Sequence, residues 1–98
     1  ALATLKDVLA EKEQAENYLV ASGLTYTVIR PGGLKSEPAT GNGLLTADPR
    51  IAGTIHRADV AQLICRCLNS ERADNQILSA VDRQMLYTPS QFEEFSLN

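Results

Sequence analysis

Apolar residues recur at helical spacing through the first part of the chain. With a step of ~100° per residue, one arc between residues 2 and 22 collects Leu2, Leu5, Val8, Leu9, Ala15, Leu19 and Val20. No Pro or Gly interrupts this stretch, and Gly23 follows it as a left-handed C-cap. The pattern predicts a helix over residues 2–22. Lys12 and Glu16 fall inside the apolar arc, and as i,i+4 neighbours they can pair.

The pattern then becomes β-branched and aromatic over residues 25–29, which predicts a strand that includes Tyr26 in its packing. Because Pro cannot continue a ladder in a central strand, we expect the chain to leave the sheet at Pro31. Residues 32–55 form a Gly- and Pro-containing loop that is long for a connector, with Gly43–Thr46 as one arm of a short hairpin.

A second helical pattern runs from His56 to Leu68, and another short apolar strand covers residues 77–81. One face of this helix collects Val60, Leu63, Ile64 and Cys67. The end of the chain contains a T-x-x-Q capping box at Thr88–Gln91, which predicts a short helix holding Phe92 and Phe95.

This order of elements predicts an α/β fold with two parallel strands. Parallel sheets are buried on both faces and seldom consist of two strands. We therefore expect the sheet to be incomplete within this chain, with further strands supplied by a complementing N-terminal half or by a second copy in a homo-oligomer.

Composition narrows the function classes. The 98 residues are 44% hydrophobic and 21% charged with a net charge of −3, which is typical of one ordinary globular domain or part of one. The basic residues are spread singly, so no nucleic-acid surface is expected. Apolar runs fall far short of the roughly 20 residues that span a bilayer, so we expect no membrane segment and a cytoplasmic location.

The chain offers little metal or thiol chemistry. His56 is the only histidine. Cys65 and Cys67 are two residues apart on a predicted helix, where they point to nearly opposite faces and can neither form a disulfide together nor clamp a metal. We expect both to be reduced thiols in or near the core, and we expect His56 to cap its helix.

The segments Lys12–Leu19 and Ser22–Leu34 resemble the C-terminal half of the atypical short-chain dehydrogenase/reductase family. The similarity is to its NAD(P)-binding branch with NmrA-like proteins and biliverdin/flavin reductases. Glu37–Gly41 and Ile55–Ala61 continue the resemblance, with His56 where the family has Ser. It covers roughly residues 8–81.

The resemblance implies a Rossmann-like, doubly wound parallel sheet, of which residues 1–98 would be the C-terminal segment of an NAD(P)-binding domain. The cofactor would be NAD or NADP. The Gly-rich loop that binds the pyrophosphate in such folds is absent, because Gly41–Gly43 has neither a preceding long strand nor a following helix and is interpreted as a turn.

Candidate site residues follow from the same resemblance. Lys12 matches the Lys of the family's Y-x-x-x-K pattern, which holds the nicotinamide ribose, but Val8 stands in place of the Tyr that acts as the general acid. Pro31, Gly32, Gly33 and Leu34 would line the nicotinamide end of the cofactor. Alternatively, Lys12 only pairs with Glu16, and the glycines only permit a sharp strand exit.

The remaining charged candidates have structural interpretations. Arg30 could anchor a phosphate or carboxylate, although a structural ion pair is favoured. Arg57 and Asp59 are two residues apart on the predicted helix and do not face each other, so helix-terminus electrostatics and contacts to the loop explain them.

Three functions remain open from the sequence. The first is an NAD(P)-dependent oxidoreductase or epimerase-like enzyme acting on a small-molecule substrate such as a carbonyl, imine or flavin-like acceptor. The second is a non-catalytic NAD(P)-sensing protein, which Val8 favours. The third is a truncated remnant that self-associates without binding a cofactor.

Overall fold

A computed structural model describes residues 14–87 and 91–98. Residues 14–21 are helical. The elements that follow are β1 (Thr27–Pro31), β2 (Gly33–Lys35), β3 (Gly43–Thr46), β4 (Thr54–His56), α2 (Arg57–Leu68), a 3-10 turn η1 (Glu71–Ala73) and β5 (Gln76–Asp82).

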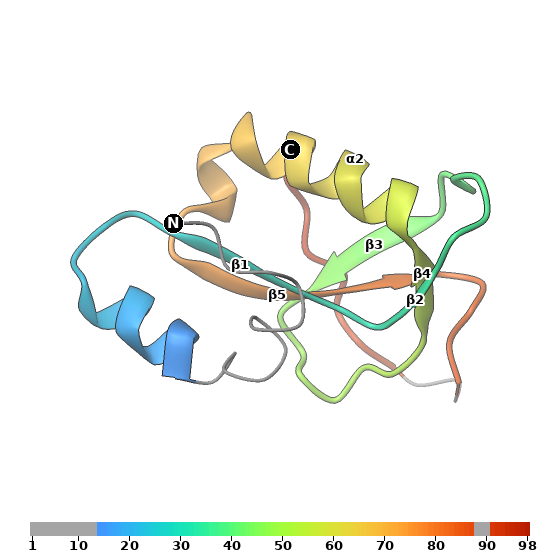
Figure 1. Ribbon diagram of the computed structural model, residues 1–98, viewed down its shortest axis with the longest axis horizontal. Coiled ribbons are helices and arrows are strands. Elements are labelled where there is room, and N and C mark those ends of the chain that lie inside the picture. The colour runs from blue at the N-terminus through green and yellow to red at the C-terminus, as the bar shows by residue number, and fades with distance from the viewer. Residues whose placement is uncertain (1–13, 88–90) are drawn as a thin grey trace.

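The predicted α/β class is confirmed by a three-stranded sheet in the order β1-β5-β3 (Figure 1). β1 and β5 are parallel, with Val28 opposite Ile77, and α2 belongs to the crossover between them. β2 and β4 form a second parallel pair, in which Leu34 lies opposite Ile55. The described residues thus form a small mixed sheet, parallel between β1 and β5, with α2 on one face.

The core lies between α2 and the sheet. Its buried residues include Leu45, Ile55, Leu63, Leu78 and Ala80. β5 is the central strand, paired with β1 on one side and with β3 on the other, and its residues from Ala80 to Asp82 are buried. The helix ends at Asn69, whose backbone N–H donates to the carbonyl oxygens of the last turn.

The expectation that the chain leaves this sheet at Pro31 is confirmed, since β1 ends at that residue. β1 includes Pro31, which lies opposite Ala80, and the next residue, Gly32, donates its N–H to Ala80 O at 2.9 Å. Because successive backbone N–H groups point to opposite sides of a strand, the nitrogen of residue 31 faces the other side. β1 is the outer strand of its sheet, so Pro31 interrupts no ladder there.

The prediction of a hairpin with Gly43–Thr46 as one arm is wrong, although these residues do form a strand. β3 pairs antiparallel with β5, with Leu45 opposite Ala80. This partner comes from the far end of the chain, and local spacing contains no information about it.

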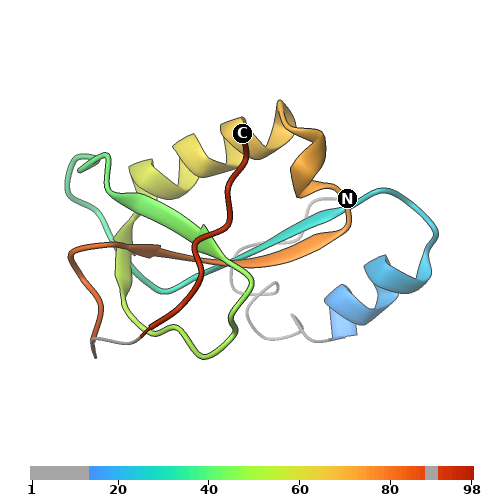
Figure 2. The same ribbon diagram turned by 180° about the vertical axis from the view of Figure 1, so that it is seen from behind.

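The C-terminal tail replaces the short helix expected there. Residues 91–98 contain no helix, and Figure 2 shows the tail crossing β3 and ending beside α2. Phe95 N–H donates to Leu45 O at 2.7 Å, and Ser70 Oγ donates to Leu97 O at 2.7 Å. Pairing with the edge of β3 satisfies backbone groups that a helix would have satisfied internally. Thr88, Pro89 and Ser90 of the capping box lie outside the described residues.

Of two local expectations about helix ends, one is confirmed and the other is off by one residue. Gly23 has φ +79°, as a left-handed C-cap requires, and it follows the helix that the structure describes from residue 14 to residue 21. α2 begins one residue later than expected, because His56 has the extended backbone of an N-cap residue.

Candidate functional site

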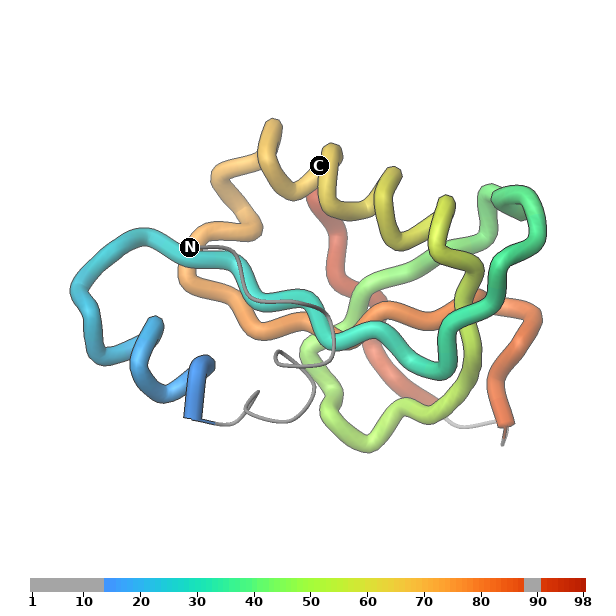
Figure 3. The backbone as a smooth tube through the Cα atoms, viewed as in Figure 1, coloured from blue at the N-terminus to red at the C-terminus, as the bar shows by residue number. Residues whose placement is uncertain are grey.

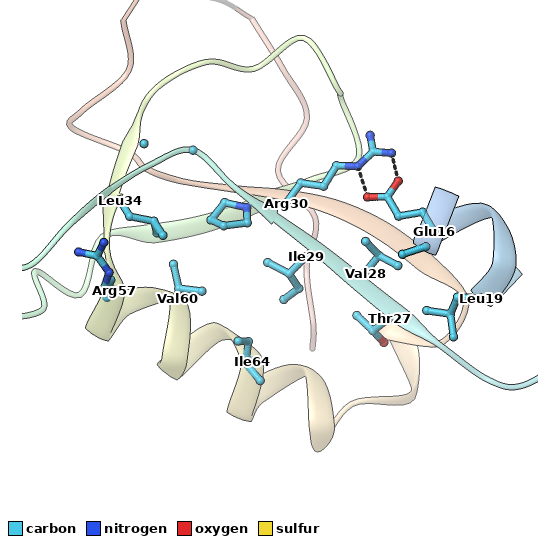
Figure 4. A pocket seen from close by; sticks show the side chains of 14 residues that line it. Glu16, Leu19, Thr27, Val28, Ile29, Arg30, Leu34, Arg57, Val60 and Ile64 are labelled. Atoms are coloured by element: carbon cyan, nitrogen blue, oxygen red, sulfur yellow. Dashed lines mark hydrogen bonds and ion pairs between the residues drawn. The ribbon is translucent and has the colours of Figure 1, made fainter. Parts of the chain in front are cut away.

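A groove of about 840 Å³ runs along β1. Its wall includes every residue from Thr27 to Leu34. Because neighbouring strand residues point to opposite faces, such an unbroken series shows that the groove follows the outer edge of β1 rather than one face of the sheet. The helix of residues 14–21 and α2 lie on either side of this edge (Figure 4).

The groove is apolar in its middle and charged at its ends. Val28, Ile29, Val60 and Ile64 contribute apolar side chains. Figure 4 shows the charged pair of Glu16 and Arg30 toward one end.

At that end, Arg30 Nε donates to Glu16 Oε1 at 2.9 Å, and Arg30 Nη2 donates to the second carboxylate oxygen. The structural ion pair favoured for Arg30 is confirmed, and its partner lies on the N-terminal helix. The two groups neutralise each other and join the helix of residues 14–21 to β1.

At the other end, Arg57 lies beside Leu34 (Figure 4). Its guanidinium donates from Nη1 to the hydroxyl of Ser36. The contact with the loop expected for Arg57 is confirmed, whereas its place in the groove was not expected, since only the fold brings β2 beside the start of α2.

The structure brings Pro31, Gly32, Gly33 and Leu34 together at this end of the groove, where β1 ends. Gly32 is required by packing: a Cβ on it would lie 2.3 Å from Gly53 O, closer than any atom can approach. Gly33 N–H donates to Gly53 O at 3.0 Å. Close packing therefore explains why residue 32 is a glycine, and Gly32 can line the groove as well.

Lys12 and Val8 lie outside the described residues. The assignment of Lys12 as a catalytic and cofactor-binding residue therefore stays a prediction. Tyr26, expected within the strand, is half-buried and directly precedes β1.

Asp59 is the centre of a buried polar cluster, which confirms the contacts to the loop expected for it. Only 1% of its surface is exposed, and its carboxylate accepts the backbone N–H groups of Thr40 and Gly41, each at 3.0 Å. The hydroxyl of Thr40 donates to Asp82 Oδ2 at 2.6 Å. These contacts hold the loop between β2 and β3 against the start of α2 (Figure 3).

His56 occupies the N-cap position, but its side chain makes no capping hydrogen bond, so this part of the expectation is wrong. The imidazole is buried, with Nδ1 3.8 Å from Asp59 Oδ2 and Nε2 3.6 Å from Glu37 Oε2. Nδ1 has no hydrogen-bond partner in the described structure. Since His56 is not among the groove residues, it supplies no proton donor there.

The two cysteines lie on opposite faces of α2, as expected. Cys67 is buried in the core, whereas Cys65 is exposed, so the expectation of two core thiols is half right. Burial raises the pKa of the Cys67 thiol. Among residues 14–87 and 91–98, no group of His, Cys, Asp and Glu side chains is arranged to hold a metal ion.

A search for membrane-spanning segments finds no helix within the described residues that is long and apolar enough to cross a bilayer.

Comparison with known proteins gives consistent matches. A model of the NAD(P)H-binding family matches residues 1–71. An uncharacterized sugar epimerase, YhfK of Bacillus subtilis, is 43% identical over 72 residues, which are 74% of this chain and 33% of YhfK. The sanguinarine reductase of Eschscholzia californica is 39% identical over 75 residues, covering 71% of this chain and 28% of that enzyme.

Solved structures agree with these sequence matches. ChuY, an anaerobillin reductase from Escherichia coli O157:H7, superposes on 90% of this chain with a TM-score of 0.68 and 28% identity, and the match covers 45% of ChuY. This likeness confirms the Rossmann-like fold expected from the sequence. The chain spans less than half the length of each of these proteins.

Proposed function

The chain belongs to the NAD(P)H-binding family, and from this we propose that it forms the substrate-side part of an NAD(P)-dependent oxidoreductase. One observation carries the proposal: Pro31–Leu34 leave the end of a parallel strand and line an apolar groove there. Open α/β sheets bind ligands outside the carboxyl ends of their strands. Relatives named as reductases support the same class of reaction.

The groove fits one end of the cofactor. Its volume of about 840 Å³ lies within the range of small-molecule sites, and Leu34 and Val60 give it an apolar wall suited to the face of a nicotinamide ring. A pyrophosphate requires backbone N–H groups at a Gly-rich turn before a helix, and no described residue of the groove belongs to such a turn. The described residues therefore fit the nicotinamide end, of either NAD or NADP.

In this proposal the bound nicotinamide supplies a hydride for a small carbonyl, imine or flavin-like acceptor. The groove residues orient the acceptor and exclude water from its apolar wall. Lys12 holds the nicotinamide ribose, in keeping with its match to the family's Lys. Val8 carries no proton donor, so the proton comes from solvent.

In this proposal, partner strands complete the sheet beside β1. Parallel strands are normally covered on both sides, and β1 is paired only with β5 in the described sheet. We propose a complementing N-terminal half as this partner, with self-association of two copies as the alternative. A cytoplasmic location is proposed with it, although some relatives are chloroplastic.

The test is hydride consumption by the purified protein. NADH and NADPH oxidation is followed with a panel of quinones, flavins and aldehydes, and Lys12→Met is compared with Lys35→Met. We expect turnover with at least one acceptor and a loss of about tenfold in kcat/KM in Lys12→Met alone.

Two outcomes separate the alternatives. Saturable nucleotide binding without turnover on any acceptor would favour the NAD(P)-sensing function, for which the replacement of Tyr by Val8 is the supporting observation. A folded protein that binds neither nucleotide would overturn both functions and leave the self-associating remnant.

A further inference from the structure

Among the described residues, three charged side chains line the groove, and two of them, Glu16 and Arg30, form an ion pair. Arg57, at the other end, donates to the neutral hydroxyl of Ser36, and no carboxylate in the described part of the chain forms an ion pair with it. The described lining therefore carries an unbalanced positive charge beside Leu34.

The position of Arg57 in its helix adds to this charge. It is the first residue of α2, a helix of 12 residues. The N-terminus of a helix carries about half a positive charge, so it repels a cation and attracts an anion. The acid of the same turn, Asp59, is committed elsewhere, because its buried carboxylate accepts the N–H groups of Thr40 and Gly41. A cation is thus held where the local field favours an anion.

The surroundings of Arg57 define the molecule that would pair with it. Leu34 and Val60 form apolar walls next to the guanidinium, and Gly32 and Gly33 add no side chains (Figure 4). A ligand with an apolar body and one anionic end complements this arrangement. The planar guanidinium matches a carboxylate or a phosphate with two parallel hydrogen bonds. The contact with Ser36 restrains the side chain, which lowers the entropy lost on binding.

We propose that Arg57 is an anion-binding residue, which pairs with a carboxylate or phosphate group on the molecule occupying the Leu34 end of the groove. This inference rests on the proposed function and adds to it a substrate class: acceptors with an apolar ring and an acidic group. The same chemistry fits a phosphate of the nucleotide, and the experiment distinguishes the two sources.

The experiment titrates the purified protein with benzoate and with benzamide, its neutral counterpart, and follows the Arg57 Nε–H signal by NMR. We expect saturable shifts with benzoate and about tenfold weaker binding of benzamide, as for the loss of a charge-assisted hydrogen bond. Arg57→Gln should bind benzoate about tenfold more weakly than the natural protein. Arg72→Gln, which removes an equal charge outside the groove, should bind it normally.

Titrations with NADH and NADPH identify the source of the anion. Unchanged nucleotide affinity in Arg57→Gln assigns the anion to the substrate, and a selective loss of NADPH affinity assigns it to a phosphate of the cofactor. Arg57→Lys keeps the charge and should retain part of the benzoate affinity if the Gln variant folds poorly. Equal binding of benzoate and benzamide, or normal benzoate binding by Arg57→Gln, would overturn the inference. Failure of both nucleotides to bind, with benzoate still preferred, would overturn only the proposed function.

Discussion

At Gly32 the backbone of the strand exit comes closest to another segment. A Cβ at this position would lie 2.3 Å from Gly53 O and 3.2 Å from Val81 Cγ1. A backbone carbonyl cannot rotate away as a side chain can, so we expect Gly32→Ala to lower the free energy of unfolding by about 1–3 kcal/mol. Urea denaturation of the purified variant measures this loss.

Gly33→Ala is the matched control. A Cβ there meets the side chains of Thr54 and Tyr87, at 3.1 Å and 3.2 Å, and these can move by a few tenths of an ångström. We expect a loss of less than about 1 kcal/mol. Equal losses in the two variants would contradict the view that contact with the Gly53 carbonyl makes the first glycine obligatory.

The carboxylate of Asp59 fixes the loop between β2 and β3. In Asp59→Asn, the amide group replaces one of the two oxygens that accept the N–H groups of Thr40 and Gly41, so a donor faces a donor. We expect a loss of about 1–3 kcal/mol in the free energy of unfolding. Faster hydrogen exchange at the amides of Thr40 and Gly41 should accompany it. Asp74→Asn, at an exposed position, is the control and should leave this hydrogen exchange unchanged. Unaltered protection of the Thr40 and Gly41 amides in Asp59→Asn would contradict the role of Asp59 in holding the loop.

At the scale of one element, the two faces of α2 predict a difference between its cysteines. Burial raises the pKa of Cys67 above the ordinary value of 9.0, while Cys65 is exposed. We therefore expect N-ethylmaleimide to modify Cys65 first, as mass spectrometry of peptides will show. Labelling of Cys67 at an equal rate would contradict the packing of α2.

The raised pKa of Cys67 also makes the free energy of unfolding depend on pH. The folded protein keeps the Cys67 proton to a higher pH than the unfolded chain, so the contribution of this thiol to stability is complete below the unfolded pKa. It is lost as the pH rises through the folded pKa. In a Cys65→Ser background, urea denaturation should show stability falling above pH ~9, and Cys67→Ala should remove this decline.

Within the described residues β1 is paired on one side only, so its backbone N–H groups are not equivalent. Since Gly32 N–H points to β5, alternation directs the N–H groups of Val28 and Arg30 to β5 as well and that of Ile29 to the open edge. We expect slow hydrogen exchange at Val28 and fast exchange at Ile29 in this chain alone. Adding the complementing half should slow Ile29. Equal hydrogen-exchange protection of Val28 and Ile29 without the complementing half would argue against an unpaired edge of β1.

The elements that could be predicted from the sequence are those encoded by local spacing. β5 and α2 lie within a residue or two of their expected bounds, since apolar periodicity and Gly or polar boundaries are local. The partner of Gly43–Thr46 and the path of the tail at Phe95 depend on contacts distant in the chain. For Asp59, helix-terminus electrostatics and contacts to the loop are expected but its burial is not, because nothing local shows that a loop will cover it.

The candidate site shows the same limit. Pro31–Leu34 came from resemblance to a family, and the structure places them together at the groove. The ion pair of Glu16 with Arg30 and the place of Arg57 depend on how the helices flank β1, which the sequence pattern alone does not specify.

At the scale of the whole molecule, the two edges of the sheet differ. The C-terminal tail covers the β3 edge through the Phe95 and Leu45 hydrogen bond, whereas the β1 edge borders the groove. The matched region is 33% of YhfK and 45% of ChuY. A groove that follows the edge of a parallel strand fits the proposal that further strands complete the site.

The most direct test of this account is a titration of NADH and NADPH monitored by nicotinamide fluorescence, on the natural protein and on two tryptophan variants of α2. Val60→Trp fills the Leu34 end of the groove, and Ala61→Trp places the same side chain on an exposed position outside it. The account predicts saturable binding to the natural protein and to Ala61→Trp, and binding about tenfold weaker or more in Val60→Trp. A folded natural protein that binds neither nucleotide, or a folded Val60→Trp variant that binds as well as the natural protein, would contradict it.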